Sequence, residues 1–131
     1  MKYILLLHLS FLIILTSCRP SIELVKSTNR NNLNKISLGM TKSEVIKIMG
    51  TITITMNNGI IVTNPYRSET MNENDKNFEI LFYYTDTKKE DGVITDDELT
   101  PIVIYENKVV GYGWRFLKDN VKRYQLQLDI R

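Results

Sequence analysis

Several short stretches of the sequence place apolar side chains at every second position. The clearest are TITITM at 51–56 and FEILFYYT at 78–85, and PIVIYE at 101–106 is a third strand-like run. Because successive side chains of a β-strand point to opposite faces, this period of two predicts strands with a buried face. The turn sequence NNG at 57–59 separates the first stretch from IIVT and predicts a hairpin. We therefore expect an antiparallel sheet at the centre of the fold.

The segment SLGMTKSEVIKIMG carries the strongest helical signal in the chain. Thr41 and Glu44 have the spacing of a capping box, in which each side chain bonds the backbone N–H of the other residue. Apolar residues follow at helical spacing, and Gly50 fits a left-handed stop. Gly39 suits a tight turn just before the helix. The pattern predicts a short amphipathic helix that packs on a flat surface.

A weaker helix is expected before this one, with Ser27 or Thr28 as its N-cap. The polar stretch 64–77 predicts a long loop. These signals together indicate an α+β domain in which two N-terminal helices pack on one face of an antiparallel β-sheet.

The C-terminal part of the chain continues the alternation. VVGYGWRFL at 109–117 predicts a strand, in which Trp114 and its aromatic neighbours are expected to be core, with a ligand-stacking patch as the alternative. The tail VKRYQLQLDIR at 121–131 predicts a final strand, and a helix over 118–124 is the alternative.

The beginning of the chain, MKYILLLHLSFLIILTSC, has the composition of a secretory signal peptide. Its apolar run, from Ile4 to Leu15, is shorter than the roughly 20 residues that a membrane-spanning helix needs. Residues 15–18 resemble the lipobox of bacterial lipoproteins, in which the cysteine is lipidated and becomes the first residue. The alternative is an ordinary signal peptide with a chance cysteine. We expect three parts: a signal peptide at 1–17, a tether lipidated at Cys18 over 18–27, and a single α+β domain at 28–131.

Cleavage would limit the chemistry of the mature chain. It would remove His8, the only histidine, and the lipid would occupy Cys18, the only cysteine. Catalysis by Ser-His-Asp or Cys-His, ordinary zinc sites and disulfides are then excluded. We assign no catalytic residue, metal ligand or cofactor, although an enzyme that uses carboxylates or a Ser-Lys pair stays an alternative. The nearly balanced charge and the lack of a basic stripe argue against a nucleic-acid partner.

The acidic stretch TKKEDGVITDDE, at 87–98, resembles a calcium loop at Gly92 and Glu98. However, its first and third ligand positions are Thr87 and Lys89, and an ammonium repels a cation. Its flanks are strand-like, whereas an EF-hand needs helices.

We therefore interpret this stretch as a connection between two strands. Asp91-Gly92 predicts a turn, and the run from Thr95 to Glu98 predicts a second capping box that opens a single helical turn. The acids would then be surface groups that serve solubility or a partner, and a weak, irregular cation site is the alternative.

Two resemblances cover residues 28–115. The helix motif, with Gly39, Met40, Thr41, Glu44 and Gly50, resembles the opening of small lipoprotein domains of the SmpA/OmlA (BamE) kind. It also occurs in secreted β-lactamase inhibitors of similar shape. The segment YYTDTKKEDGVITDDELTPIVIYENKVVGYG resembles a related bacterial lipoprotein family of unknown function. The chain lacks the proline that commonly follows the helix glycine in the SmpA/OmlA (BamE) domains; Thr51 stands there.

These observations predict a lipid-anchored lipoprotein of the cell envelope, attached to the membrane by acyl chains such as palmitate. We expect a non-enzymatic module that binds an envelope protein, through the uncovered sheet face or the 64–77 loop. The alternative is a ligand-binding or inhibitor-type lipoprotein. Arg19 is not the aspartate that retains lipoproteins at the inner membrane, which favours the outer membrane, facing the periplasm.

Overall fold

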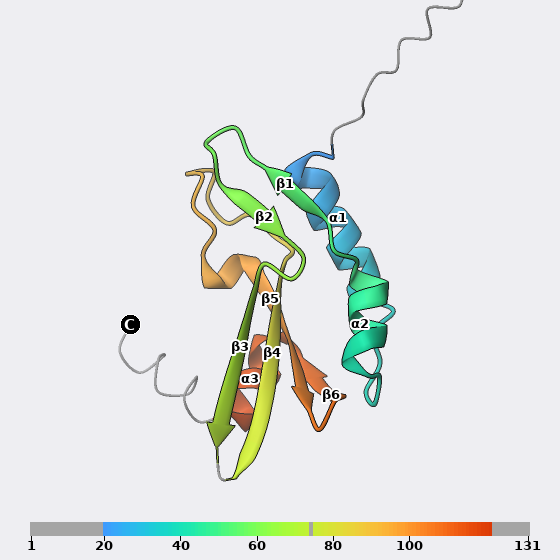
Figure 1. Ribbon diagram of the computed structural model, residues 1–131. Coiled ribbons are helices and arrows are strands. Elements are labelled where there is room, and N and C mark those ends of the chain that lie inside the picture. Colours follow the sequence, from blue (N-terminus) through green and yellow to red (C-terminus); the bar gives the residue numbers. More distant parts are fainter. Residues whose placement is uncertain (1–19, 74, 122–131) are drawn as a thin grey trace, which may run out of the picture.

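The computed structural model describes residues 20–73 and 75–121 (Figure 1). The helices of this part are α1 (Ile22–Leu33), α2 (Lys42–Met49) and α3 (Gly113–Asn120). The strands are β1 (Thr53–Thr55), β2 (Ile61–Thr63), β3 (Arg67–Glu73), β4 (Lys76–Tyr84), β5 (Leu99–Tyr105) and β6 (Lys108–Tyr112), and a 3-10 turn, η1 (Asp96–Glu98), precedes β5.

The strands form two antiparallel sheets. One is the β1–β2 hairpin, whose turn at 57–59 was predicted from NNG and has Gly59 at a φ of 85°. The other has the order β3-β4-β5-β6. In its register, Phe82 of β4 lies opposite Arg67 of β3 and Pro101 of β5.

Strand β4 is buried on both faces over its second half, from Ile80 to Tyr84. Its side chains divide the core into two clusters. The first cluster joins residues of α1, the hairpin, the large sheet and α3, namely Val25, Ile54, Val62, Met71, Ile80, Phe82, Tyr84, Leu99, Val103, Leu117 and Val121. The second joins α2 to the opposite face, with Ile36, Val45, Met49, Leu81, Tyr83, Ile102, Ile104 and Val109.

The predicted arrangement of two N-terminal helices on one face of one sheet is wrong. The helices lie at both ends of the described chain with the strands between them, and the strands form two sheets. Val25 of α1 shares its cluster with Leu117 of α3, whereas Val45 of α2 belongs to the other cluster. The helices therefore do not share one core.

Helix α3 replaces the second half of the strand that was expected over 109–117. Gly113 has a φ of 83°, which allows the chain to leave the sheet direction at this point. From Gly113 onward the chain is helical, so Leu117 and Val121, four residues apart, both enter the core. The alternation of Tyr112, Trp114 and Phe116 continues across Gly113 and hid the change of period.

Two element boundaries also differ from expectation. Helix α1 begins at Ile22, with Ser21 as its N-cap in place of the expected Ser27 or Thr28; the Ser21 hydroxyl accepts from the Leu24 amide at 3.2 Å. The expected 64–77 loop contains strand β3, which pairs with β4 over its whole length. Its polar composition fits an edge strand with one exposed face. The predicted strand over 121–131 falls almost wholly on residues 122–131, outside the described residues.

A buried amide pair joins elements that are distant in sequence. Asn29 of α1 donates to the Asn64 side chain at 3.0 Å and to the Tyr84 carbonyl at 2.8 Å. Asn64 donates in return to the Asn29 side chain at 2.7 Å and to the Met49 carbonyl at 3.0 Å. Because both side chains are buried and satisfied, they fix α1 against the ends of α2 and β4.

Candidate functional site

One face of the large sheet is only half covered. Along β4, Leu81 and Tyr83 belong to the second cluster and are covered by α2. Toward the β3–β4 turn, the same face carries Asn77, which is exposed, and Glu79, which is partly exposed. The hydrophobic cover therefore ends in the middle of the strand.

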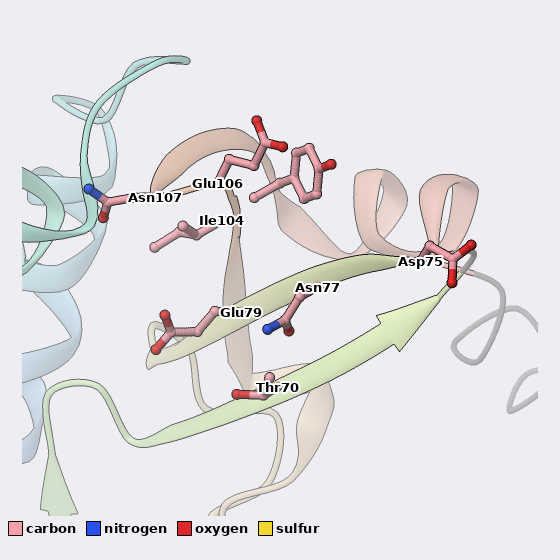
Figure 2. A pocket seen from close by; sticks show the side chains of 8 residues that line it. Thr70, Asp75, Asn77, Glu79, Ile104, Glu106 and Asn107 are labelled. Carbon is pink, nitrogen blue, oxygen red and sulfur yellow. The ribbon is translucent and has the colours of Figure 1, made fainter.

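The uncovered half forms a hollow of about 460 Å³. Its walls are strands β3, β4 and β5 and two turns, with Thr70, Asp75, Asn77, Glu79, Ile104, Tyr105, Glu106 and Asn107 as the lining (Figure 2). Figure 2 shows Asp75 at the far end of the hollow, in the β3–β4 turn, and Asn107 at the other side, in the β5–β6 turn. The surface is an open, mostly polar depression on the sheet.

Cross-strand pairing brings the central side chains together. Glu79 lies opposite Thr70 of β3 on one side and opposite Ile104 of β5 on the other. Directly paired side chains on one face lie about 5 Å apart at their Cβ atoms. Residues separated by more than 30 positions in the sequence thus make a single surface.

The hollow is acidic. Asp75, Glu79 and Glu106 line it, and none of its lining residues is basic. From outside the lining, Lys42 at the start of α2 forms an ion pair with Glu79 at 2.5 Å. A hydrogen bond with the Glu106 carboxylate raises the pKa of Tyr105. The surface offers carboxylates, amides and hydroxyls to a polar partner.

The two turns at the ends of the hollow hold strained backbone. Asp75, Glu106 and Asn107 have φ values of 61°, 48° and 61°. Asp and Asn tolerate this left-handed conformation, whereas it is uncommon for Glu. The pairing of β5 with β6 on either side of the turn holds Glu106 at the rim of the hollow.

The residues of the predicted helix motif do not line the hollow. They stabilise helix α2 and the turn before it. Thr41 and Glu44 form the predicted capping box, with Glu44 accepting from the Thr41 amide at 2.8 Å. Gly50 ends the helix at a φ of 74°. The Gly39 amide donates to the Val109 carbonyl at 2.8 Å.

The turn before α2 also accepts a hydrogen bond from β6. The Val109 amide donates to the Met40 carbonyl at 2.8 Å, and Thr41 forms an isolated bridge with Lys108. Residues 39–41 thus cover part of the β6 edge of the sheet. An edge strand with free backbone groups invites association with other chains, and this turn removes part of that risk.

The acidic connection contains one carboxylate that is not a surface group. The predicted capping box of Thr95 and Glu98 is confirmed, but Glu98 is only 1 % exposed. Its carboxylate accepts from the amides of Lys88 at 2.6 Å, Lys89 at 3.3 Å and Thr95 at 3.1 Å. The expectation that all acids of this stretch lie on the surface is therefore wrong, because Glu98 organises the loop from inside.

Some of the aromatic residues belong to the core, and others lie on the surface. The Trp114 indole donates to the Leu99 carbonyl at 2.7 Å, and its ring lies 5.7 Å from that of Phe82. Tyr83 is fully buried, and burial raises the pKa of its hydroxyl. Tyr112, in contrast, is exposed. Trp114 is thus packed against the core, as the sequence predicted.

Two further properties concern membranes and metals. Cys18, the predicted lipid attachment, lies outside the described residues. Over 20–73 and 75–121, no helix has the length and apolar character that crossing a bilayer requires. The same ranges hold no group of three or more His, Cys, Asp and Glu side chains that could bind a metal ion.

The fold and the hollow define a small α+β domain that presents a polar sheet surface beside a two-sided core. The chain belongs to a family described as "Protein of unknown function (DUF3192)", whose model matches residues 20–119. No curated protein matches the chain, and no solved structure does.

The sequence indicated the 64–77 stretch as a contact surface, but it did not reveal the hollow. Thr70 and Asp75 fall in a stretch that was expected to be a loop, and Asn77 was placed at its end. Glu79 was assigned to the strand but to no site. One available signal was the alternation of β4, in which Asn77 and Glu79 are the polar members of an otherwise apolar face.

Proposed function

We propose that this protein is a lipid-anchored lipoprotein of the cell envelope that binds another envelope protein without catalysing a reaction. The observation that carries the binding role is the hollow on the uncovered half of the sheet. Rigid strands present its side chains, as precise binding surfaces require. An interface of this kind needs no catalytic group.

The anchor is supported by the sequence around Cys18. The lipobox pattern ends in the only cysteine of the chain, and the first described helix begins four residues later. The resemblance to the SmpA/OmlA (BamE) lipoproteins favours the same role. Arg19 favours the outer membrane, with the domain in the periplasm.

The carboxylates of the hollow support binding over hydrolysis. A general acid or base must be free to exchange a proton with a substrate. Glu79, however, is partly exposed and paired with the Lys42 ammonium. Such a carboxylate suits recognition of donors on a partner better than proton transfer.

Site-specific photo-crosslinking tests the binding surface. A photoreactive residue at Asn77, inside the hollow, should give an adduct with one envelope protein in intact cells. The matched control is Arg115, which is exposed on α3 outside the hollow. Adducts of equal yield from both positions, or none from Asn77, would contradict the proposed surface.

A further inference from the structure

Three segments meet at one end of the molecule. They are the start of α1, the turn of the β1–β2 hairpin and the connection between β4 and η1 (Figure 1). The Asn58 amide of the hairpin turn donates to the Gly92 carbonyl of the connection at 2.8 Å. Lys26 of α1 donates to the Thr87 hydroxyl at 2.7 Å. These bonds hold the three segments together as one surface, which we name the α1 end.

The segments of the α1 end carry exposed apolar side chains. Leu24 of α1 is 50 % exposed, Ile61 at the start of β2 is 59 % exposed, and Val93 of the connection is 57 % exposed. They account for three of the five exposed large apolar side chains in the described part of the chain. Each of the three joined segments, or the strand next to it, thus exposes one large apolar side chain, and exposed apolar groups on neighbouring segments are the material of a contact surface.

The short segment between Cys18 and α1 indicates which partner covers the α1 end. Only Arg19 and Pro20 separate Cys18 from Ser21, the N-cap of α1. A fully extended chain spans at most about 3.6 Å per residue, so Ser21 lies within roughly 11 Å of Cys18. This step rests on the proposed function, because acyl chains on Cys18 would hold that residue at the bilayer surface.

We propose that the α1 end docks on the lipid bilayer, with Leu24, Ile61 and Val93 in the interfacial region. Charge is mixed here, since Lys88 and Lys89 are followed directly by Glu90 and Asp91. The contact therefore depends on apolar side chains and on the lipid anchor, and not on attraction to anionic headgroups.

Docking in this way directs the hollow away from the membrane. The β3–β4 and β5–β6 turns, which bound the hollow, lie at the end opposite to the start of α1 (Figure 1). Strand β4 runs between the two ends with 9 residues, or about 30 Å. A partner in the aqueous compartment would meet the hollow with its surface free.

Thiol-directed fluorescent probes test this orientation. The lipidated full-length protein is placed in vesicles of phosphatidylethanolamine and phosphatidylglycerol, with one new cysteine labelled by an environment-sensitive dye. Lipidation occupies the Cys18 sulfur, so the new cysteine is the only free thiol. The positions are Val93→Cys and Ile61→Cys at the α1 end and Asn107→Cys at the hollow as the control.

The dye at residues 93 and 61 should show blue-shifted emission and strong quenching by spin-labelled lipids. The dye at residue 107 should emit as in water and resist these lipids. Lipidated, membrane-bound protein with equally solvated dyes at all three positions would overturn the docking proposal alone. Protein that carries no lipid on Cys18 by mass spectrometry would overturn the anchor as well, so the two failures are distinguishable.

Discussion

At the scale of single residues, Glu98 shows how a carboxylate can be structural. Its side chain is buried and accepts three backbone N–H groups of its own loop. Its backbone carbonyl also accepts from the amides of Thr85 and Asp86. Hydrogen bonds to a charged acceptor contribute more than neutral ones, and buried donors without partners are costly.

Replacing Glu98 with Ala should lower the free energy of unfolding by about 1.5 to 3 kcal/mol, because loop amides lose their acceptor. Urea denaturation measures this change. Glu90→Ala, which removes an exposed carboxylate from the same loop, is the matched control and should have little effect. Equal effects of the two substitutions would show that the Glu98 contacts do not stabilise the loop.

At the scale of elements, α2 is defined by its caps. The Thr41 hydroxyl accepts from the Glu44 amide at 3.2 Å, and the Glu44 carboxylate accepts from the Thr41 amide. The latter bond holds the pKa of Glu44 below its ordinary value. This interaction therefore stabilises the fold fully at a pH above the pKa that Glu44 has in the unfolded chain. The stabilisation is lost as the pH falls through the pKa that Glu44 has in the folded protein.

Thr41→Ala should destabilise the domain by about 1 kcal/mol, since a helix N-cap is lost. The same substitution should raise the pKa of Glu44 toward its ordinary value, because the Thr41 hydroxyl contributes to the lowering. Carboxyl NMR titration follows the pKa, and Ser43→Ala, in the same turn, serves as the control. A Glu44 pKa at its ordinary value in the unaltered protein would exclude the capping interaction.

Elements with a local signal could be predicted, and those that depend on distant partners could not. The capping box at Thr41 and the NNG turn define their elements within a few residues. The start of α3 depends on Gly113, whose left-handed φ the sequence does not specify. Strand β3 has polar residues because it lies at a sheet edge, so its composition resembles that of a loop.

At the scale of the whole molecule, β4 separates two cores. Val45 of α2 is fully buried against the face that carries Leu81 and Tyr83. The floor of the hollow is the first half of the same strand, where Asn77 and Glu79 replace the buried apolar residues. The hollow also depends on the register that pairs Glu79 with Thr70 and Ile104, which no local sequence pattern encodes.

Val45→Asp should destabilise the domain by several kcal/mol, because it places an unpaired charge in the core beneath α2. Ser43→Asp adds the same charge to an exposed position of the same helix and should be tolerated. Thermal unfolding followed by circular dichroism compares them. Small and equal shifts in melting temperature would mean that α2 does not pack on the sheet as described.

We propose that a lipid on Cys18 holds this domain at the membrane. Metabolic labelling with a palmitate analogue, followed by membrane fractionation, tests it in the full-length chain. The unaltered protein should carry the label and sediment with membranes, whereas Cys18→Ser should be unlabelled and released. A Cys18→Ser protein that keeps both the label and the membrane location would contradict the claim.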